Sequence, residues 1–401
     1  MNIDGFKSFG MSGPPIRFSR LNFLVGANAS GKTNVLRALR FLQNSILQNV
    51  ELAVDAEGGL TEVRNKILRE KKEAKPLTLR VKFSGLSFDV GSKSGGKYSI
   101  DEARYELKLD VRSESGVPAI ESEALEAKLS QGGKPLPNYS LRRDREHVEI
   151  HDPLSPVEKP ERRFPIPAQE ASRAALGVVF FSLPCVILRS EMESWSFFNI
   201  NPQTARAPFR DVADARLGSS GEYLSVVLHR IEKENGKGSL ASIIAGLKGA
   251  IPGFKSIKTT QLPVENKWAF QLLEDRIRGA INPESASDGT IRLLALMVIA
   301  QWSSRHSSLL AIEEPENGLH PHLSEHIVSI LRAASTDRQI IATTHNPDFL
   351  DFLEPEEVQL CDKEEGFTKI RIASDQEEVT TFKRRFRLGE LWEQGVLGGI
   401  P

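Results

Sequence analysis

The chain has 401 residues, with 52 lysines and arginines against 53 aspartates and glutamates, and 40% of the residues are hydrophobic. This composition is that of a folded protein with two or three domains, and it excludes collagen-like and wholly disordered chains. The two cysteines, Cys185 and Cys361, are too few for a disulfide scaffold, and the longest apolar run, 293–300, is too short to span a bilayer. We therefore expect a cytoplasmic protein with no membrane partner.

The first part of the chain has the pattern of a strand, a glycine-rich loop and a helix. Leu21–Val25 is a short apolar run, and apolar residues recur at helical spacing from 35 to 42. We expect this helix to continue to about Val50. Beyond Pro76 the pattern changes to alternating apolar and polar residues, which is typical of an antiparallel sheet with one exposed face. The alternating segments are 79–83, 105–111 and 147–150, with turn residues at 91–96 and 132–133.

The rest of the chain is a connector followed by helical and strand-like segments. We interpret the proline-rich stretch 153–167 as a connector without secondary structure, and 168–250 as mostly helical. The last third alternates between the two patterns, with helices at 291–302 and 323–334 and apolar strands at 309–312 and 339–343. Continuous apolar strands that alternate with helices predict a parallel sheet covered on both faces.

The glycine-rich loop carries a phosphate-binding pattern. Residues 26–33 read Gly-Ala-Asn-Ala-Ser-Gly-Lys-Thr, which matches G-x-x-x-x-G-K-[ST] between the apolar strand and the helix. In this pattern, glycines let backbone N–H groups point at phosphate oxygens, the lysine supplies charge, and the Thr33 hydroxyl binds Mg²⁺. The expected nucleotide contacts are Gly26, Ala27, Asn28, Ala29, Ser30, Gly31, Lys32, Thr33 and Asn34.

Two carboxylates follow the apolar strand at 309–312. Carboxylates at the tip of a buried strand are unfavourable unless they face a cation or water. In a phosphate-loop enzyme, this position holds Mg²⁺ and orients the attacking water. We therefore predict that Glu313 serves the metal and that Glu314 is the general base or the group that positions the water. The alternative is a strand that ends in a solvated acidic turn.

Two further positions suit phosphate chemistry. His345 follows the apolar strand at 339–343, where an imidazole can contact a γ-phosphate, although a structural histidine is the more common case. Its place about thirty residues after Glu314 favours the functional interpretation. Ser287, Asp288 and Gly289 precede a helix, where free N–H groups bind anions, and an ordinary helix cap explains them equally well.

Three histidines raise the question of a metal site with Glu316. No His-Glu-x-x-His pattern is present, and Pro321 indicates the start of a helix. We therefore favour structural roles over metal binding for His320, His322 and His326. The two cysteines have no paired spacing and are interpreted as ordinary core or surface thiols.

In this order, the motifs resemble those of ATP-binding-cassette (ABC) ATPases. The resemblance is to the RecF-like and overcoming-lysogenization-defect-like branch, which is related to structural-maintenance-of-chromosomes (SMC) heads. Residues 4–9 are similar to its opening strand, 26–33 to its Walker A motif and 309–314 to its Walker B motif. Residues 313–321 are similar to its Glu-Glu-Pro-Glu block, 287–290 to its signature and 344–347 to its switch-histidine block. The segment 388–399 is similar to the end of predicted stand-alone ATPases without a TOPRIM domain.

The resemblance implies an α/β fold, a P-loop NTPase head of the ABC type. Its mixed or parallel sheet would be flanked by helices, and an antiparallel β and helical lobe would be inserted. We expect four parts, which are the Walker A part at 1–75, the β insertion and connector at 76–165, the helical lobe at 166–260, and the part with signature, Walker B and switch histidine at 261–401.

The resemblance further implies that two chains bind two molecules of ATP with Mg²⁺ head to tail. Lys32, Glu314 and His345 would be catalytic, and Thr33 and Glu313 would hold the metal. Residues 287–289 of one chain would complete the site of the other, so ATP would hold a homodimer or higher oligomer together. Asp288 stands where many transporters carry glycine. For the usual glutamine-bearing loop, the candidates are Gln169 and Gln203.

We weigh three functions. The first is an ATP-hydrolysing switch in a nucleic-acid-related process, antiphage defence or DNA repair. The second is the ATP-driven subunit of a membrane transporter, which is disfavoured because Lys32 and Ser287 are 255 residues apart and transporter heads are more compact. The third is a slow ATP-sensing scaffold, which the retained Lys32, Thr33, Glu314 and His345 disfavour.

Two partners are expected for the first function. Only 56 residues follow His345, too few for a typical nuclease domain, so a nuclease or toxin effector would be a separate protein. DNA is the other partner that the resemblance implies. Basic residues give local support at 142–145, 162–163 and 383–387, and the last run could track phosphates. Basic runs are more often simply solvated surfaces.

Overall fold

The chain folds into two compact units in a computed structural model. The structure describes residues 1–70, 75–89, 97–110, 118–154, 161–234, 240–302, 307–382 and 386–397. Unit 1 comprises Met1–Arg17, Asn34–Glu193 and Lys363–Lys369, and unit 2 comprises Phe18–Thr33, Ser194–Asp362 and Ile370–Pro401. Both units are therefore assembled from segments far apart in the chain. The four-part division expected from the sequence remains a proposal.

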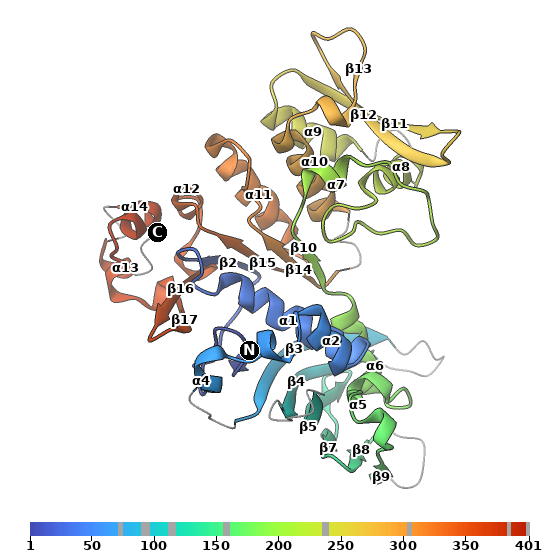
Figure 1. Cartoon of the computed structure of the whole chain (residues 1–401), viewed down its shortest axis with the longest axis vertical. Helices are drawn as coiled ribbons and strands as arrows, with labels where there is room; N and C mark the ends of the chain where they lie inside the picture. Colours follow the sequence, from blue (N-terminus) through green and yellow to red (C-terminus); the bar gives the residue numbers. More distant parts are fainter. Residues whose placement is uncertain are drawn as a thin grey trace. The chain divides into compact units, whose positions relative to one another are not determined.

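Unit 1 is built on an eight-stranded sheet with the order β1-β3-β4-β5-β7-β8-β9, in which β6 pairs with β5 (Figure 1). Neighbouring strands of this sheet are antiparallel. In β4, Ala103, Tyr105 and Leu107 are buried and the residues between them are not, because successive side chains of a strand point to opposite faces. The strands are β1 (Asn2–Asp4), β3 (Leu77–Asp89), β4 (Lys97–Asp110), β5 (Ala119–Gln131), β6 (Lys134–Pro135), β7 (Tyr139–Arg143), β8 (His147–His151) and β9 (Glu161–Pro165).

The predicted connector at 153–167 is wrong over its last part. Residues Glu161–Pro165 form β9, which pairs with β8 and ends the sheet order. An edge strand tolerates proline because one side of its backbone needs no ladder partner, and this explains why Pro165 does not prevent the strand. Pro156 and Pro160 lie outside the described residues, as do the predicted turn at 91–96 and the basic residues 383–385.

The helix that follows the glycine-rich loop is shorter than expected. Helix α1 (Lys32–Leu47) ends before Val50, and a second helix, α2 (Val50–Ala56), begins there. The extended Asn49 separates them, and its side chain accepts the Leu52 N–H as the cap of α2. The other helices of unit 1 are α3 (Leu60–Val63), α4 (Lys66–Glu70), α5 (Ala175–Val178), α6 (Leu183–Glu193) and the 3-10 turn η1 (Ala168–Glu170).

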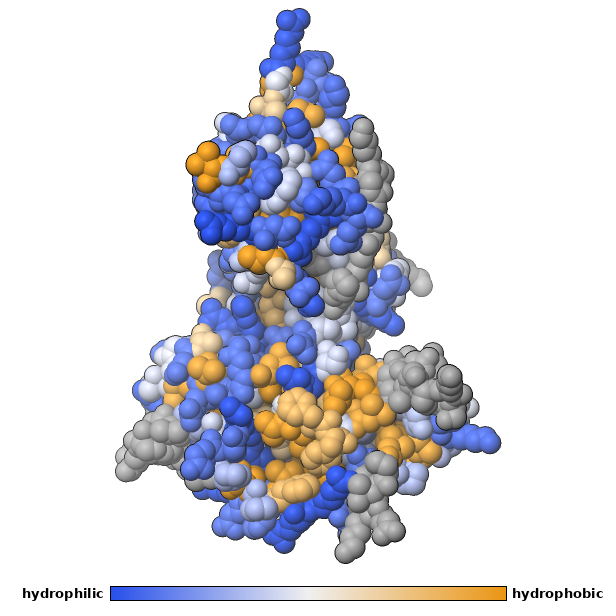
Figure 2. Space-filling model, turned by 90° about the vertical axis from the view of Figure 1, so that its right-hand side faces the viewer, coloured by the Kyte–Doolittle hydropathy of each residue, from blue (hydrophilic) through white to orange (hydrophobic). Residues whose placement is uncertain are grey.

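Unit 1 also exposes a group of large apolar side chains. Phe180 and Phe181, between α5 and α6, are 62% and 54% exposed, and Phe164, Val178 and Val186 are exposed as well. The ring centroids of Phe164 and Phe181 are 5.8 Å apart. Figure 2 shows apolar side chains gathered on the lower part of the face, over the region of α5 and α6 in Figure 1. Exposed apolar groups of this kind are characteristic of contact surfaces.

Unit 2 contains a six-stranded sheet with the order β10-β14-β15-β2-β16-β17. From β10 to β16, neighbouring strands are parallel. The carboxyl ends of parallel strands meet at one edge, so the segments that follow β2, β14 and β15 are brought together there. The strands are β2 (Leu21–Val25), β10 (Ser196–Phe198), β14 (Leu309–Glu313), β15 (Gln339–Thr344), β16 (Val358–Glu364) and β17 (Phe367–Ile372).

The core of unit 2 forms where strands of this sheet pack with helices α10 and α11. Nearly every side chain of α10 from Ile291 to Ala300 is buried, as expected for a helix that is apolar on all sides. The predicted α/β fold with a sheet flanked by helices is confirmed. The helices are α7 (Pro202–Arg206), α8 (Leu224–Glu234), α9 (Ala241–Ala250), α10 (Asp288–Gln301), α11 (Ser324–Ala334), α12 (Pro347–Leu350), α13 (Glu377–Phe382) and α14 (Leu388–Glu393).

Unit 2 is completed by a small antiparallel sheet and several 3-10 turns. The sheet has the order β11-β12-β13, with β11 (Phe254–Leu262), β12 (Lys267–Glu274) and β13 (Ala280–Ile281). The turns are η3 (Pro283–Ser285), η5 (Pro321–Leu323), η6 (Pro355–Glu357) and η7 (Ala373–Asp375). Across the part of the chain that the structure describes, none of the helices has the length and apolar character that a bilayer crossing requires.

Candidate functional site

The glycine-rich loop is a tight turn between β2 and α1. Gly26 lies against β16, and a Cβ atom there would overlap the carbonyl oxygen of Cys361. Ala29 and Gly31 both have positive φ, 64° and 104°, which bends the backbone back toward the start of the helix. Asn28 and Ala29 are exposed at the tip, whereas Ser30 is buried. The first N–H groups of α1 have no partner within the helix and are available to an anion.

Lys32 is directed into this loop. Its Nζ donates hydrogen bonds to the carbonyl oxygens of Gly26 at 2.6 Å and Ala27 at 2.8 Å, and the residue is 6% exposed. Burial lowers the pKa of Lys32, and the negative charges of Glu314 and Glu316 act in the opposite direction. The lysine therefore places its ammonium group at the loop, where it interacts electrostatically with Glu314 and Glu316.

The two residues after Lys32 differ in their surroundings. Thr33 is half-buried at the start of α1. The Asn34 Nδ2 group donates to Ser8 Oγ at 2.7 Å, and Thr368 Oγ1 donates to the same oxygen at 2.7 Å. Asn34 thus anchors the N-terminal segment of unit 1, a role that the motif alone did not indicate.

The acidic pair lies at the end of β14, between β10 and β15. Glu313 accepts a hydrogen bond from Asn199 Nδ2 at 3.3 Å. Glu314 has a φ of 43°, and its N–H donates to the carbonyl oxygen of Thr343 at 3.0 Å. A non-glycine residue in this left-handed region is strained, and such strain occurs where the surrounding structure fixes a functional side chain. The bonds to β15 supply that constraint.

Glu314 and His345 form a pair across neighbouring strands. His345 Nδ1 lies 3.2 Å from Glu314 Oε1, and their side chains are 46% and 35% exposed. The pairing follows from the parallel register of β14 and β15, in which Glu313 is opposite Thr343. A carboxylate that is open to solvent and lies beside an imidazole can accept a proton from a water molecule within hydrogen-bond distance.

Glu316 is a further acidic residue that the sequence did not single out as a partner of this pair. It is 8% exposed, its Oε1 accepts a hydrogen bond from the Thr344 hydroxyl, and its Oε2 has no hydrogen-bond partner among the described residues. Burial raises the pKa of Glu316, whereas the Thr344 bond acts to lower it. Thr344 also accepts the Asn346 N–H at 3.0 Å, so it links Glu316 to the segment after His345.

The three histidines considered for a metal site point to different partners. His320 Nδ1 and His322 Nδ1 are 2.6 Å apart on the exposed turn η5, and His326 Nε2 lies 3.1 Å from the carbonyl oxygen of Gly246. Within the described ranges, no group of three histidine, cysteine or acidic residues is arranged to hold a metal ion. Structural roles for these histidines remain the interpretation.

The predicted signature segment caps a long helix. Ser287 precedes α10, and its Oγ accepts the Thr290 N–H at 3.1 Å. Ser287 and Asp288 are exposed, whereas Gly289 packs closely on the turn after β14, where a Cβ would lie 3.0 Å from the Gly318 carbonyl oxygen. The helix N-terminus is thus open to a ligand and fixed against the acidic turn.

Arg206 is the principal residue that the sequence reasoning missed. Its guanidinium, on α7, donates to the carbonyl oxygens of Pro283 and Ala286, both at 2.8 Å, and to Asp288 Oδ1 at 2.6 Å. The residue is 7% exposed. Asp288, the departure from the glycine of many transporters, is therefore the partner of a buried arginine, and no local pattern could have indicated this pair.

An asparagine at the end of β10 lies beside Glu313. Strand β10 lies beside β14, and the residue after it is Asn199, which reaches Glu313. Gln169 lies in η1 of unit 1, and Gln203 lies exposed on α7. The signal for β10 was too short to detect, since the strand has three residues.

The basic runs near β7 are occupied by contacts within unit 1. Arg143 is 4% exposed, lies 3.9 Å from Glu123 and donates to backbone carbonyl oxygens at 171 and 173. Arg145 pairs with Asp110, and Arg163 with Glu149 at 3.3 Å. Arg143 therefore serves the fold of unit 1 and cannot contact DNA from its buried position.

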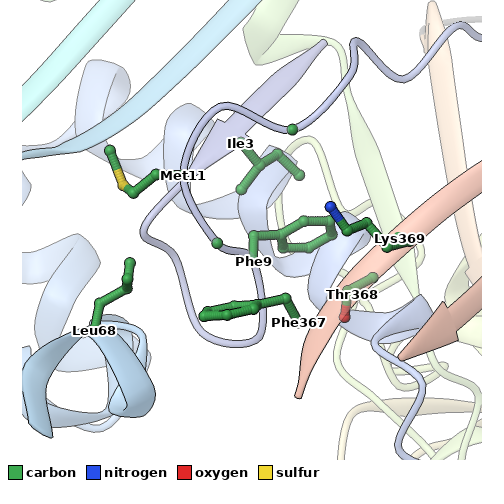
Figure 3. A pocket seen from close by; sticks show the side chains of 9 residues that line it. Ile3, Phe9, Met11, Leu68, Phe367, Thr368 and Lys369 are labelled. Atoms are coloured by element: carbon green, nitrogen blue, oxygen red, sulfur yellow. The ribbon is translucent and has the colours of Figure 1, made fainter. Parts of the chain in front are cut away.

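A separate pocket lies within unit 1, near the chain's beginning. It has a volume of about 190 Å³ and contains none of the predicted site residues in its lining. Figure 3 shows Phe9, Met11 and Phe367 around the opening, with Lys369 at one side. Apolar side chains predominate in its lining, and none of the lining residues carries a carboxylate.

Comparison with known proteins identifies one family and a set of similar structures. The family described as "AAA domain, putative AbiEii toxin, Type IV TA system" matches residues 21–351. No curated protein sequence matches the chain. The SMC head bound to the C-winged helix domain of ScpA is 13% identical over 92% of this chain and 95% of its own, with a TM-score of 0.47.

Two further SMC heads are similar at comparable levels. The SMC head domain from Thermotoga maritima is 14% identical over 92% of this chain and 96% of its own, with a TM-score of 0.39. The Smc head domain with an extended coiled coil, bound to the C-terminal domain of ScpA and derived from Pyrococcus furiosus, is 12% identical over 96% of this chain and 98% of its own, with a TM-score of 0.45.

Proposed function

Because the chain belongs to the family of AAA domains described as putative AbiEii toxin, Type IV TA system, we propose that it hydrolyses ATP with Mg²⁺ at the edge of the unit 2 sheet. The observation that carries this proposal is the Glu314–His345 pair, 3.2 Å apart, which follows the neighbouring strands β14 and β15. Strand β15 in turn pairs with β2, the strand that leads into the loop of Lys32. Family membership supports nucleotide binding. The proposal of hydrolysis depends in addition on the geometry of Glu314 and His345.

The residues of the site fit a magnesium-bound triphosphate. Carboxylate and hydroxyl oxygens are the ligands that Mg²⁺ prefers, and Thr33 and Glu313 supply them. When bound, the metal neutralises the charge of the β and γ phosphates. The unpartnered Oε2 of the buried Glu316 is a further acceptor near the acidic pair, which supports a site built for a cation or a polar ligand.

Each residue has a distinct task in this proposal. The N–H groups of the loop and Lys32 bind the phosphate oxygens and hold the triphosphate in place. Glu314 accepts a proton from the attacking water as that water attacks the γ-phosphorus, and His345 orients the Glu314 carboxylate through their contact. Asn199 fixes the orientation of Glu313. The positioning of these groups, more than covalent chemistry, would supply the rate enhancement.

We propose in addition that two chains clasp ATP head to tail. The support is the N-terminus of the 14-residue helix α10, where Ser287 and Asp288 are exposed. A second chain could place this positive helix end at the γ-phosphate of the first, where it would stabilise developing negative charge. Hydrolysis would remove the shared ligand and release the homodimer or higher oligomer.

The test is Glu314→Gln, which removes the base and keeps the shape of the side chain. We expect ATP binding to persist, turnover to fall at least about 100-fold, and an ATP-dependent dimer to accumulate in sedimentation analysis. Lys32→Ala is the control, since it should weaken ATP binding itself. Full turnover in Glu314→Gln would contradict the proposed base, and a dimer that forms equally without ATP would contradict the clasp.

The cellular role is proposed as antiphage defence or DNA repair, exerted through a separate nuclease or toxin effector. The support is the family description, which names a putative AbiEii toxin and a type IV toxin–antitoxin system. Co-purification of the chain from its host in the presence of ATP would identify the effector.

Binding of DNA is the second partner proposal, and it rests on the run at 383–387. Replacement of Lys383, Arg384, Arg385 and Arg387 by glutamine should reduce both DNA affinity and the salt dependence of binding, because fewer counterions are released. The proposal would be contradicted if the variant bound duplex DNA as tightly as the unmodified chain at both about 50 and about 200 mM salt.

A further inference from the structure

The C-terminal helix α14 packs against the helix that follows the switch histidine. Helix α12 begins at Pro347, two residues after His345, with Asn346 as its cap. Helix α14 carries the segment Leu388-Gly389-Glu390-Leu391-Trp392, whose apolar members are buried in the core of unit 2. This segment has no task in the proposed chemistry.

The contact between the two helices depends on a glycine. A Cβ atom at Gly389 would lie 2.6 Å from the carbonyl oxygen of Pro347 and 2.8 Å from Asp351 Oδ1. Both distances are shorter than Cβ contacts in real proteins, and the first is to backbone, which cannot rotate away. The backbone of α14 therefore touches the first residue of α12 directly.

Asp351 completes the contact from the other end of α12. Its Oδ1 accepts the Gly389 N–H at 3.0 Å, and its Oδ2 lies 3.5 Å from an Arg387 guanidinium nitrogen. The Gly389 N–H lies in the first turn of α14, where it has no partner within the helix, so Asp351 supplies its hydrogen-bond acceptor. The negative charge of Asp351 also interacts favourably with the positive end of the helix dipole. One carboxylate thus joins the end of α12 to the start of α14.

The other side of the switch segment is also fixed. The Asn346 N–H donates to Thr344 Oγ1 at 3.0 Å, and Thr344 donates to the buried Glu316. His345 therefore lies between two anchored points, Thr344 before it and the α12–α14 contact after it. The backbone that carries the imidazole is held from both directions, although the imidazole itself is 46% exposed.

We infer that Gly389 and Asp351 are positioning residues that set the distance between His345 and Glu314. The inference rests on the proposed function, and it assigns a role to the C-terminal segment in that function. A larger residue at 389 displaces the Pro347 carbonyl, and the displacement passes through Asn346 to His345. A shift of about 1 Å in a catalytic group lowers turnover by up to about 100-fold, while nucleotide binding at the phosphate loop is untouched.

The experiment compares Gly389→Ala and Asp351→Ala with matched controls. Asp351→Asn keeps an acceptor for the Gly389 N–H, and Leu188→Ala, in the buried part of α6 in unit 1, lowers stability away from the switch. We expect both alanine variants to lose at least about tenfold in kcat with the Kd for ATP within about threefold. Asp351→Asn should stay within about threefold of the unmodified chain in kcat.

Three results would overturn the inference. The first is a folded Gly389→Ala variant with unchanged kcat. The second is a Leu188→Ala variant that has the same melting temperature as the alanine variants at 389 and 351 and loses as much kcat as they do. The loss would then be due to general destabilisation. The third is an equal loss in Asp351→Asn and Asp351→Ala. If Gly389→Ala does not fold, the two Asp351 variants alone decide.

A second readout separates this inference from the proposed function. Amide hydrogen exchange across 344–351 reports the order of the switch segment without any turnover. Faster exchange there in Asp351→Ala, but not in Asp351→Asn, supports the positioning role even if the chain hydrolyses no ATP. Unchanged exchange in Asp351→Ala overturns it even if Glu314→Gln abolishes turnover.

Discussion

The buried guanidinium of Arg206 allows a stability prediction that can be worked from the structure. Arg206→Ala removes two hydrogen bonds to the carbonyl oxygens of Pro283 and Ala286 and one to Asp288. A hydrogen bond to a charged group contributes about 1.5–3 kcal/mol net, so the two carbonyl bonds together contribute about 3–6 kcal/mol. The Asp288 side chain is 61% exposed, and solvent reduces its share to about 0–1 kcal/mol.

One contribution has the opposite sign. The second terminal nitrogen of Arg206, Nη1, is buried without a hydrogen-bond partner in the described residues, and its desolvation cost disappears in the variant. We therefore expect the free energy of unfolding to fall by about 3–5 kcal/mol in Arg206→Ala. Asp288→Asn should change it by less than about 1 kcal/mol, because the exposed partner contributes little.

The assay is urea unfolding followed by tryptophan fluorescence. All four tryptophans, Trp195, Trp268, Trp302 and Trp392, belong to unit 2, which also contains Arg206. Their signal therefore reports on the unit that the substitution affects. A loss below about 1 kcal/mol in Arg206→Ala would refute the reasoning. Equal losses in Arg206→Ala and Asp288→Asn would instead assign the energy to the ion pair.

Two further predictions concern the loop and the buried carboxyl. Gly26→Ala should lower stability by about 1–3 kcal/mol, because the added Cβ overlaps the Cys361 carbonyl oxygen. Gly13→Ala is the control in thermal melts, since a Cβ there meets open space. Equal changes of melting temperature in the two variants would contradict the overlap. Burial raises the pKa of Glu316 in the folded chain above its pKa in the unfolded chain. The stability that Glu316 contributes is therefore present below the unfolded pKa and is lost as the pH rises through the folded pKa. Glu316→Gln should therefore gain stability relative to the unmodified chain as the pH is raised through that window, as measured by urea unfolding at several pH values, and a constant difference would contradict the raised pKa.

The fold class and the central motifs could be predicted because their signals are local. The strand Leu21–Val25, the phosphate loop and the start of α1 occupy one continuous stretch, so apolar runs, glycines and helical spacing identify them together. The strands β14 and β15 are short apolar runs bounded by polar residues, which is typical of a parallel sheet. The end of α1 was misplaced because a single extended residue, Asn49, ended it.

Other features depend on residues that only the folded chain brings together. The sequence by itself determined which side chains end β14 and β15, but the parallel register of the two strands decided that Glu314 meets His345. Asn199 became a neighbour of Glu313 through a three-residue strand with no detectable pattern. Local periodicity can report an element's type, whereas contacts across long separations depend on how the elements pack.

Two close backbone approaches in unit 2 follow the same rule. Gly26 must be small because a carbonyl of β16 lies beside it, and Gly389 because a carbonyl of α12 does. Asp288 is held by Arg206, 82 residues earlier in the chain. The sequence thus determined the phosphate loop, the acidic strand and the switch histidine as separate local motifs. Only the tertiary structure decided their distances and their supports, because these arise from pairing and packing between distant segments.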